Sequence, residues 1–85
     1  RERSAYIEDE KIELTLKEYD LLKYLMQNES IVLTRPQIMD KIWGTDFLGE
    51  TRTVDMHVNF VRQKLGNKAG YIKTVRGLGY KFEVE

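Results

Sequence analysis

The sequence predicts a small α+β fold in which three helices are preceded by one β-hairpin and followed by another. Two patterns predict it. Apolar and polar residues alternate near both ends, as in strands, whereas the segments between carry apolar residues three or four positions apart, as in helices. The 85 residues fit a single domain, expected over residues 1–85, and 41% of them are hydrophobic, enough for one small core.

Local signals predict the first hairpin and the first helix. Residues 5–14 alternate loosely around a turn at residues 9–11, so we expect two short strands there. Thr15 followed by Glu18 forms a capping box, in which each side chain accepts a backbone N–H of the first helical turn. A helix is expected over residues 16–28, with an apolar face made of Tyr19, Leu22, Leu25 and Met26.

A second capping box predicts the second helix. Residues 31–33 form a short apolar segment, expected as a bridge or strand. Thr34 and Gln37 then have the capping-box spacing, and Pro36 falls in the first turn, where a missing N–H costs nothing. We expect a helix over residues 35–43 that ends at Gly44, followed by a loop over residues 44–50.

The third helix, expected over residues 52–65, has two unlike faces. Apolar residues lie within about 60° of one another at 100° per residue and form the expected buried stripe: Val54, Val58, Val61 and Leu65. Asp55 is the only acid of this helix, although soluble helices normally expose Glu and Lys. The outward positions suit a partner better than water: Arg52, Met56, Asn59 and Gln63, with Thr53 and Phe60 to one side.

A second hairpin completes the order. Residues 71–76 and 80–84 alternate as two strands, and Gly77-Leu78-Gly79 between them are expected to form a tight turn, because glycine accepts the backbone conformations that such turns need. Two helices ahead of a third, followed by a basic hairpin, form the pattern of a winged helix-turn-helix.

The charge is unevenly distributed although the net charge is zero. Residues 1–50 have seven Lys and Arg against eleven Asp and Glu, a net charge of −4. Residues 51–85 have seven against three, a net charge of +4. A basic half can present a positive face to a polyanion; a chance distribution explains the charge equally well when it is considered alone.

The sequence has few of the residues that catalysis, metal binding or membrane insertion would need. There is no cysteine for a disulfide, a thiolate zinc site or a nucleophile, and His57, the only histidine, has no serine within a helical turn and no paired carboxylate spacing. We therefore expect neither an enzyme nor a metal or cofactor site. Charged residues interrupt every window of about 20 residues, and the charged start is no signal peptide, so we expect a cytoplasmic protein without a membrane partner.

Binding of double-stranded DNA fits the sequence better. Amide and guanidinium groups on the third helix can make paired hydrogen bonds with base edges in a major groove, and Met56 and Phe60 can contact thymine methyl groups. Arg76 at the hairpin tip has the charge that a minor groove attracts. The other candidates are Arg52, Thr53, Asn59 and Gln63 for base edges, Lys73 and Lys81 beside Arg76, and His57, Arg62 and Lys64 for phosphates.

Each of these residues also has a purely structural explanation. His57 can hydrogen-bond the backbone at the edge of its helix. Met56 and Phe60 can pack against a neighbour, and Trp43 can belong to the core with its indole N–H at the surface. The alternative function is therefore a winged-helix protein-docking module that does not bind DNA, and salt-dependent DNA affinity separates the two.

Four stretches of the sequence form a recognisable set: Leu-Thr-Leu-Lys-Glu-Tyr-Asp-Leu-Leu at 14–22, Ile-Trp-Gly at 42–44, Arg-Thr-Val-Asp-Met-His-Val at 52–58 and Thr-Val-Arg-Gly-Leu-Gly-Tyr at 74–80. Through them, residues 5–83 resemble the winged-helix output domain of bacterial response regulators of the OmpR/PhoB class. The last two stretches at this separation are highly specific together.

The resemblance implies a transcription factor of a two-component phosphorelay, which binds promoter DNA as a head-to-tail dimer under the control of an N-terminal receiver domain outside this chain. It implies that helix 52–65 enters the major groove and Arg76 an adjacent minor groove. The implied phosphate contacts are Trp43, Arg52, His57, Arg62, Thr74 and Tyr80. The loop over residues 44–51 is implied to contact RNA polymerase, through Thr45, Asp46, Phe47, Leu48 and Glu50.

Two features depart from that family. Its members often carry basic residues where this chain has Asn59 and Phe60, so we expect a different base preference and a weaker hold on phosphates. The family also begins with a four-stranded sheet, whereas residues 5–14 supply two strands, and this chain begins at Arg1. We therefore expect a fragment with a truncated sheet, less stable than a chain that begins earlier.

Overall fold

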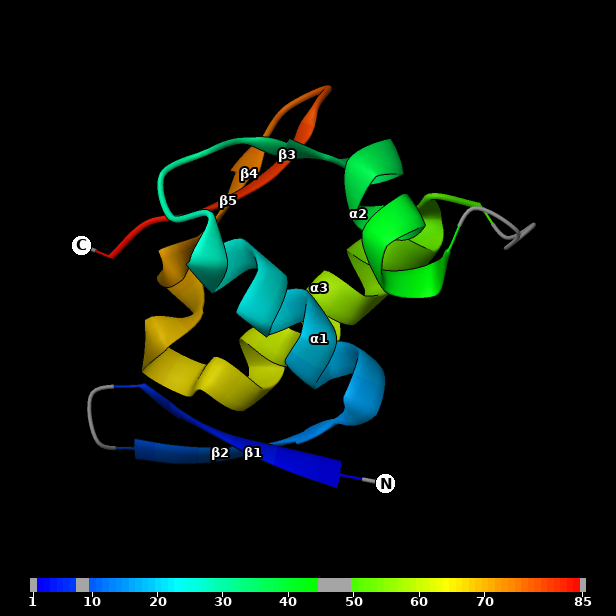
Figure 1. Ribbon diagram of the computed structural model, residues 1–85. Helices are drawn as coiled ribbons and strands as arrows, with labels where there is room; N and C mark the ends of the chain where they lie inside the picture. The colour runs from blue at the N-terminus through cyan, green and yellow to red at the C-terminus, as the bar shows by residue number, and fades with distance from the viewer. Residues whose placement is uncertain (1, 8–9, 45–49, 85) are drawn as a thin grey trace.

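The computed structural model describes residues 2–7, 10–44 and 50–84, with side chains from residue 11 onward. In this part of the chain, the helices α1 and α3 lie between two small antiparallel sheets (Figure 1). The first sheet has two strands in the order β1-β2, and the second has three in the order β3-β5-β4. The predicted α+β winged helix-turn-helix is confirmed.

The N-terminal hairpin consists of β1 (Glu2–Ile7) and β2 (Glu10–Thr15). The strands pair from Glu2 opposite Thr15 to Ile7 opposite Glu10, so the hairpin is present as predicted but longer than residues 5–14. In β2, Ile12 and Leu14 are buried while the residues between and beside them are exposed, because successive side chains of a strand point to opposite faces.

Helix α1 (Leu16–Gln27) begins at the predicted capping box, in which both the Thr15 and the Glu18 side chains accept their backbone N–H. Its buried residues are Glu18, Leu21, Leu22 and Leu25. The prediction of Met26 in the apolar face was wrong, since Met26 is exposed. It lies about 90° around the helix from the centre of the buried stripe, and Tyr19, about 110° away on the same side, is half-buried.

A short strand and a short helix follow. The strand β3 (Leu33–Thr34) lies within the second sheet, with Leu33 opposite Tyr80 of β5. Helix α2 (Arg35–Trp43) begins at the second predicted capping box and ends at Gly44, whose φ of 96° favours glycine. The helix is confirmed because capping signals act locally, within one helical turn. The strand expected over residues 31–33 is shifted, since only Leu33 of these residues lies in β3.

Helix α3 (Arg52–Leu65) has the predicted bounds and the predicted buried stripe. Val54, Val58 and Val61 have no solvent exposure. After α3 the chain continues as a 3-10 helix, η1 (Gly66–Tyr71), a segment for which the sequence analysis named no element.

The C-terminal hairpin consists of β4 (Ile72–Val75) and β5 (Gly79–Phe82), joined by a turn at residues 76–78. Gly77, with a φ of 78°, occupies the turn as predicted. The assignment of Gly79 to the turn was wrong, since it is the first residue of β5. A β-carbon on Gly79 would collide with the carbonyl oxygen of Leu33, so the close approach of β3 is what requires glycine there.

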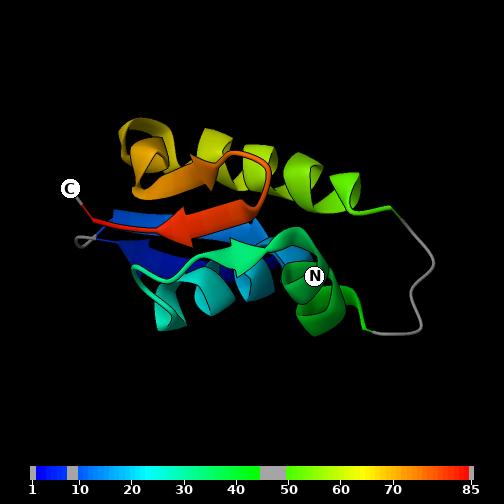
Figure 2. The ribbon, with the colours of Figure 1, turned by 90° about the horizontal axis from the view of Figure 1, so that it is seen from above.

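One hydrophobic core joins both sheets to the helices, and it lies against the inner face of α3. Viewed from above, β4 is the strand of the second sheet nearest to α3 (Figure 2), and Arg62 of α3 bonds Ile72 and Thr74 of β4. The buried residues of the core are Ile12, Leu14, Leu21, Leu22, Leu25, Leu33, Ile38, Met39, Val54, Val58, Val61, Leu65, Ile72, Tyr80 and Phe82. Within the described ranges, no helix has the length and apolar character needed to cross a membrane.

Candidate nucleic-acid interface

The outer face of α3 carries the side chains predicted to contact bases. Arg52, Asn59 and Gln63 are exposed, and Thr53 is half-buried. Phe60 is also exposed, as is Met56 one helical turn before it, with 40% and 48% of their surface in contact with solvent. This face therefore combines guanidinium and amide groups, which can pair with base edges, with apolar groups that have no partner in the core.

An aromatic row supports one edge of this face. The His57 ring packs edge-on against Trp43, with the ring centroids 4.9 Å apart, and against Phe60 at 5.6 Å. His57 Nδ1 also lies 2.9 Å from the carbonyl oxygen of Thr53, which is the backbone contact that the structural explanation of this residue predicts. The row joins the end of α2 to the middle of α3 and restricts the orientation of Phe60.

The C-terminal half of α3 is tied to the hairpin through Arg62. One nitrogen of its guanidinium, Nη2, donates to the carbonyl oxygen of Ile72 at 2.6 Å and to Thr74 Oγ1 at 2.9 Å. The same guanidinium lies over the Tyr80 ring, 5.6 Å from its centroid. Arg62 and Thr74, both predicted to contact phosphates, are thus brought together at the junction of α3 and β4.

A second tie, which the sequence analysis missed, begins at Asp55. Asp55 Oδ1 accepts hydrogen bonds from Arg35 Nε at 2.8 Å and from the Tyr80 hydroxyl at 2.5 Å. Burial alone would raise the pKa of this carboxyl, but the hydrogen bonds from Tyr80 and Arg35 outweigh it and lower the pKa. Burial and the bond to Asp55 in turn raise the pKa of Tyr80.

Two residues that were predicted to contact phosphates, Tyr80 and Lys64, instead bind carboxylates of this domain. Tyr80 is only 5% exposed, and its hydroxyl proton is donated to Asp55. Lys64 Nζ lies 2.7 Å from Glu18 Oε1, on the side of α3 that faces α1. Burial raises the pKa of Glu18, but the hydrogen bonds from Lys64 and from the Thr15 N–H together lower it by more, so the net shift is downward.

The tip of the hairpin presents the predicted minor-groove residue. Arg76 is exposed in the turn, and no described residue is its hydrogen-bond or ion-pair partner. Lys73 is half-buried and donates to the carbonyl oxygen of Gly70 at 2.7 Å, while Lys81 lies 3.5 Å from the carboxylate of Glu83. Of the three basic residues predicted here, Arg76 is therefore the one whose charge is freely presented at the tip.

The predicted polymerase-contact loop falls largely outside the described residues, which exclude Thr45, Asp46, Phe47 and Leu48. Glu50 is described and exposed, and its carboxylate lies 3.8 Å from Arg52 Nε. Because both side chains are about four-fifths exposed, this ion pair contributes little and leaves Arg52 available to a ligand.

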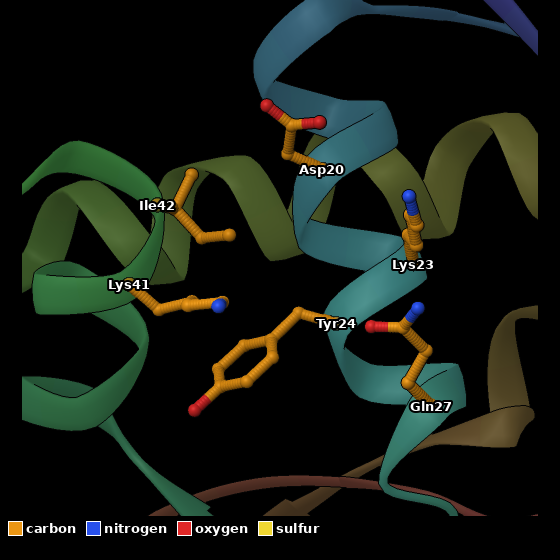
Figure 3. Close-up of a pocket in the computed structure, with 6 residues that line it drawn as sticks. All are labelled: Asp20, Lys23, Tyr24, Gln27, Lys41 and Ile42. Carbon is orange, nitrogen blue, oxygen red and sulfur yellow. The ribbon is translucent and has the colours of Figure 1, made fainter.

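A cavity of about 220 Å³ lies away from this face, between α1 and α2. Its lining is mainly polar, and Figure 3 shows Tyr24 and Lys41 facing one another across it, with the Lys41 ammonium 5.9 Å from the ring centroid. Among the described residues there is no cluster of His, Cys, Asp and Glu suited to hold a metal ion. The outer face of α3 and the hairpin tip thus form the candidate interface.

Comparison with protein families matches residues 9–82 to the family described as "Transcriptional regulatory protein, C terminal". The sensory transduction protein RegX3 of Mycolicibacterium smegmatis is 49% identical over 80 residues, which cover 91% of this chain and 35% of that protein. The alkaline phosphatase synthesis transcriptional regulatory protein PhoP of Bacillus subtilis is 48% identical over 82 residues, covering 93% and 34%. The chain therefore spans about a third of the length of these relatives.

Solved structures agree with the sequence match. The DNA-binding domain of Bacillus subtilis CssR superposes with a TM-score of 0.82 at 34% identity, covering 94% of this chain and 90% of that one. The DNA-binding domain of the response regulator AdeR, solved in complex with an intercistronic region, has a TM-score of 0.82 at 31% identity, covering 96% and 86%. This chain belongs to the family of C-terminal domains of transcriptional regulatory proteins, the winged-helix DNA-binding domains of OmpR/PhoB-type response regulators.

Proposed function

We propose that this domain binds double-stranded promoter DNA with sequence specificity, placing α3 in the major groove and Arg76 in the adjacent minor groove. The observation that carries the proposal is the outer face of α3, which exposes arginine, amides and apolar groups and whose only acid is engaged by Arg35 and Tyr80. A major groove of about 12 Å admits one α-helix. The AdeR domain, which shares this fold, was solved with an intercistronic region.

The chemistry of the exposed face supports an assignment of roles. Arg52 pairs with guanine, and Asn59 and Gln63 pair with adenine, because these side chains match the donor and acceptor patterns of those bases. Met56 and Phe60 contact thymine methyl groups, which are the main apolar feature of the major groove. The site that we infer for α3 is consequently rich in A·T pairs.

Phosphate contacts fall at the edges of this face. Arg62 and Thr74 lie together at the junction with the hairpin, and His57 lies beside Trp43 at the other edge. Lys73, on β4, adds a cation on the hairpin itself. We assign Lys64 and Tyr80 to internal contacts instead, because Glu18 and Asp55 already engage their polar groups.

The relatives are about three times as long as this chain, so the full-length protein has room for further domains and partners. We propose that a receiver domain in the same full-length protein controls DNA binding through phosphorylation, and that two copies bind head-to-tail on direct repeats. The loop over residues 44–51, of which residues 45–49 lie outside the described part of the chain, is proposed to contact RNA polymerase.

Selection of bound sites from a random duplex pool, followed by titration of the affinity against salt, tests the proposal. Contact with four to six phosphates predicts a slope of log K against log salt near −4 to −5. A recovered motif with such a slope supports sequence-specific binding. Absence of binding at low salt would refute the proposal and favour the protein-docking alternative, whereas binding without a motif would refute base reading by α3.

Arg76→Ala tests the hairpin tip. The variant is expected to weaken binding by about 1–3 kcal/mol and to relax the preference for A·T pairs at flanking positions. Lys23→Ala is the matched control, because it removes a positive charge from an exposed position of α1 beside the cavity between α1 and α2. If Arg76→Ala and the wild type have equal affinity and equal site preference, Arg76 does not contact the minor groove.

A further inference from the structure

Asp55 is an unusual residue for a helix that meets DNA. A carboxylate near phosphates opposes binding electrostatically, and Asp55 is the only acid between residues 52 and 65. Its side chain is 39% exposed, so it is not simply part of the core. Oδ1 joins three elements, because it accepts from Arg35 of α2 and from Tyr80 of β5 while belonging to α3 itself.

The hairpin is attached to α3 at two points. Asp55 binds Tyr80, and Arg62 binds the Ile72 carbonyl and the Thr74 hydroxyl. The two attachment residues are seven positions apart, which separates them by about 10 Å along a helix. One attachment would allow the hairpin to pivot, whereas two along the helix axis determine its angle to α3.

The Asp55 attachment also leads to the hairpin tip. Arg35, whose guanidinium is bound to Asp55 and lies 5.1 Å from the Tyr80 ring centroid, donates its backbone N–H to the carbonyl oxygen of Leu78 at 3.2 Å. Leu78 in turn donates to Val75 and closes the turn that contains Arg76. A chain of direct contacts therefore connects Asp55 to the turn from which Arg76 projects.

We infer that Asp55 is a positioning residue, which sets where Arg76 lies relative to α3 and hence the spacing between the bases read by α3 and the flanking minor-groove site. The inference rests on the proposed function, since it takes α3 and Arg76 as DNA-contacting parts. It assigns Tyr80 to the same attachment rather than to a phosphate.

A double-mutant cycle on DNA affinity tests this role. Asp55→Asn keeps the shape of the side chain but removes the charge that pairs with Arg35, and it is expected to weaken binding to the selected site by about fivefold to twentyfold. In the Arg76→Ala background the same change is expected to have almost no effect, because the tip no longer makes the contact that Asp55 positions. Asp40→Asn, at an exposed position of α2, controls for the removal of one negative charge.

Tyr80→Phe provides a second variant, which removes only the hydroxyl bond to Asp55 and retains the buried ring. It is expected to weaken binding in the same direction, and again only when Arg76 is present. A direct contact of the Tyr80 hydroxyl with a phosphate would instead give losses that add to those of Arg76→Ala. This variant keeps the test decisive if Asp55→Asn fails to fold.

The base preference of the variants separates positioning from general destabilisation. Asp55→Asn is expected to lose the preference for A·T pairs in the flanking minor groove and to retain the preference for the bases that α3 contacts. A partly unfolded domain would lose both preferences equally. Additive effects of Asp55→Asn and Arg76→Ala, or a uniform loss of preference, would overturn the inference. If Arg76→Ala itself binds like the wild type, the proposed minor-groove contact fails as well, which is a distinguishable result.

Discussion

Replacing Val61 by alanine tests the conclusion that α3 uses one face for the core and the opposite face for DNA. Val61 has no solvent exposure. The change removes two carbons worth about 0.8 kcal/mol each on burial, and the residual cavity adds to this loss. Alanine is the better helix former by about 0.5 kcal/mol, so the expected net loss is about 1.5–2.5 kcal/mol. Domains of this size have a total stability of about 4–13 kcal/mol, and the melting temperature should fall by about 6–20 °C.

The assay is urea denaturation followed by far-ultraviolet circular dichroism, combined with DNA titration at a temperature where both variants are folded. Gln63→Ala, on the exposed face of the same helix, is the matched control, and its stability should stay within about 0.5 kcal/mol of the wild type. Val61→Ala should retain its DNA affinity once folded, whereas Gln63→Ala should lose affinity. A Val61→Ala variant as stable as the wild type would refute the two-faced description of α3.

Three further predictions concern other parts of the domain. Glu18→Gln should lower the unfolding free energy by about 1–2 kcal/mol at pH 7, because it removes the ion pair with Lys64. Since folding lowers the pKa of Glu18, the extra stability of the wild type is present above about pH 4.3, the ordinary pKa of Glu, and is lost as the pH falls through the lowered pKa. Denaturation at several pH values measures this difference. A stability difference that is independent of pH would contradict this reasoning. Gly79→Ala should cost about 2–4 kcal/mol of unfolding free energy because the β-carbon meets the Leu33 carbonyl oxygen, and unchanged melting would show that β3 can move away. Phe60→Arg should raise non-specific affinity, steepen the salt slope by about 0.9 and change the selected motif, so a wild-type motif and slope would place Phe60 off the DNA.

Local signals explain which elements could be predicted from the sequence. The capping boxes at Thr15 and Thr34 act over three residues, and the valine stripe of α3 repeats every helical turn, so neither depends on distant parts of the chain. Met26 was misplaced for the corresponding reason. A helix whose flank is apolar has more than one possible buried face, and the packing of α1 against α3 selects one of them.

The parts of the site that were missed depend on contacts between distant residues. In the sequence, Asp55 is a single acid on the outward face of its helix. Its hydrogen-bond partners, Arg35 and Tyr80, are 20 and 25 positions away in the chain. Lys64 reads as a cation available to phosphates, but its partner Glu18 is 46 positions away on α1. No local pattern announces either pairing.

The sequence by itself determined the order of the strands and α-helices, the bounds of α3, the two faces of that helix and the exposed arginine of the hairpin tip. Spacing and capping are sufficient for these because they are properties of a segment a few residues long. The tertiary structure alone decided that β3 joins the hairpin, that Gly79 serves close strand packing, and that Asp55 and Arg62 bind the hairpin to the helix. Such contacts form only when the shared core brings distant segments within hydrogen-bonding distance.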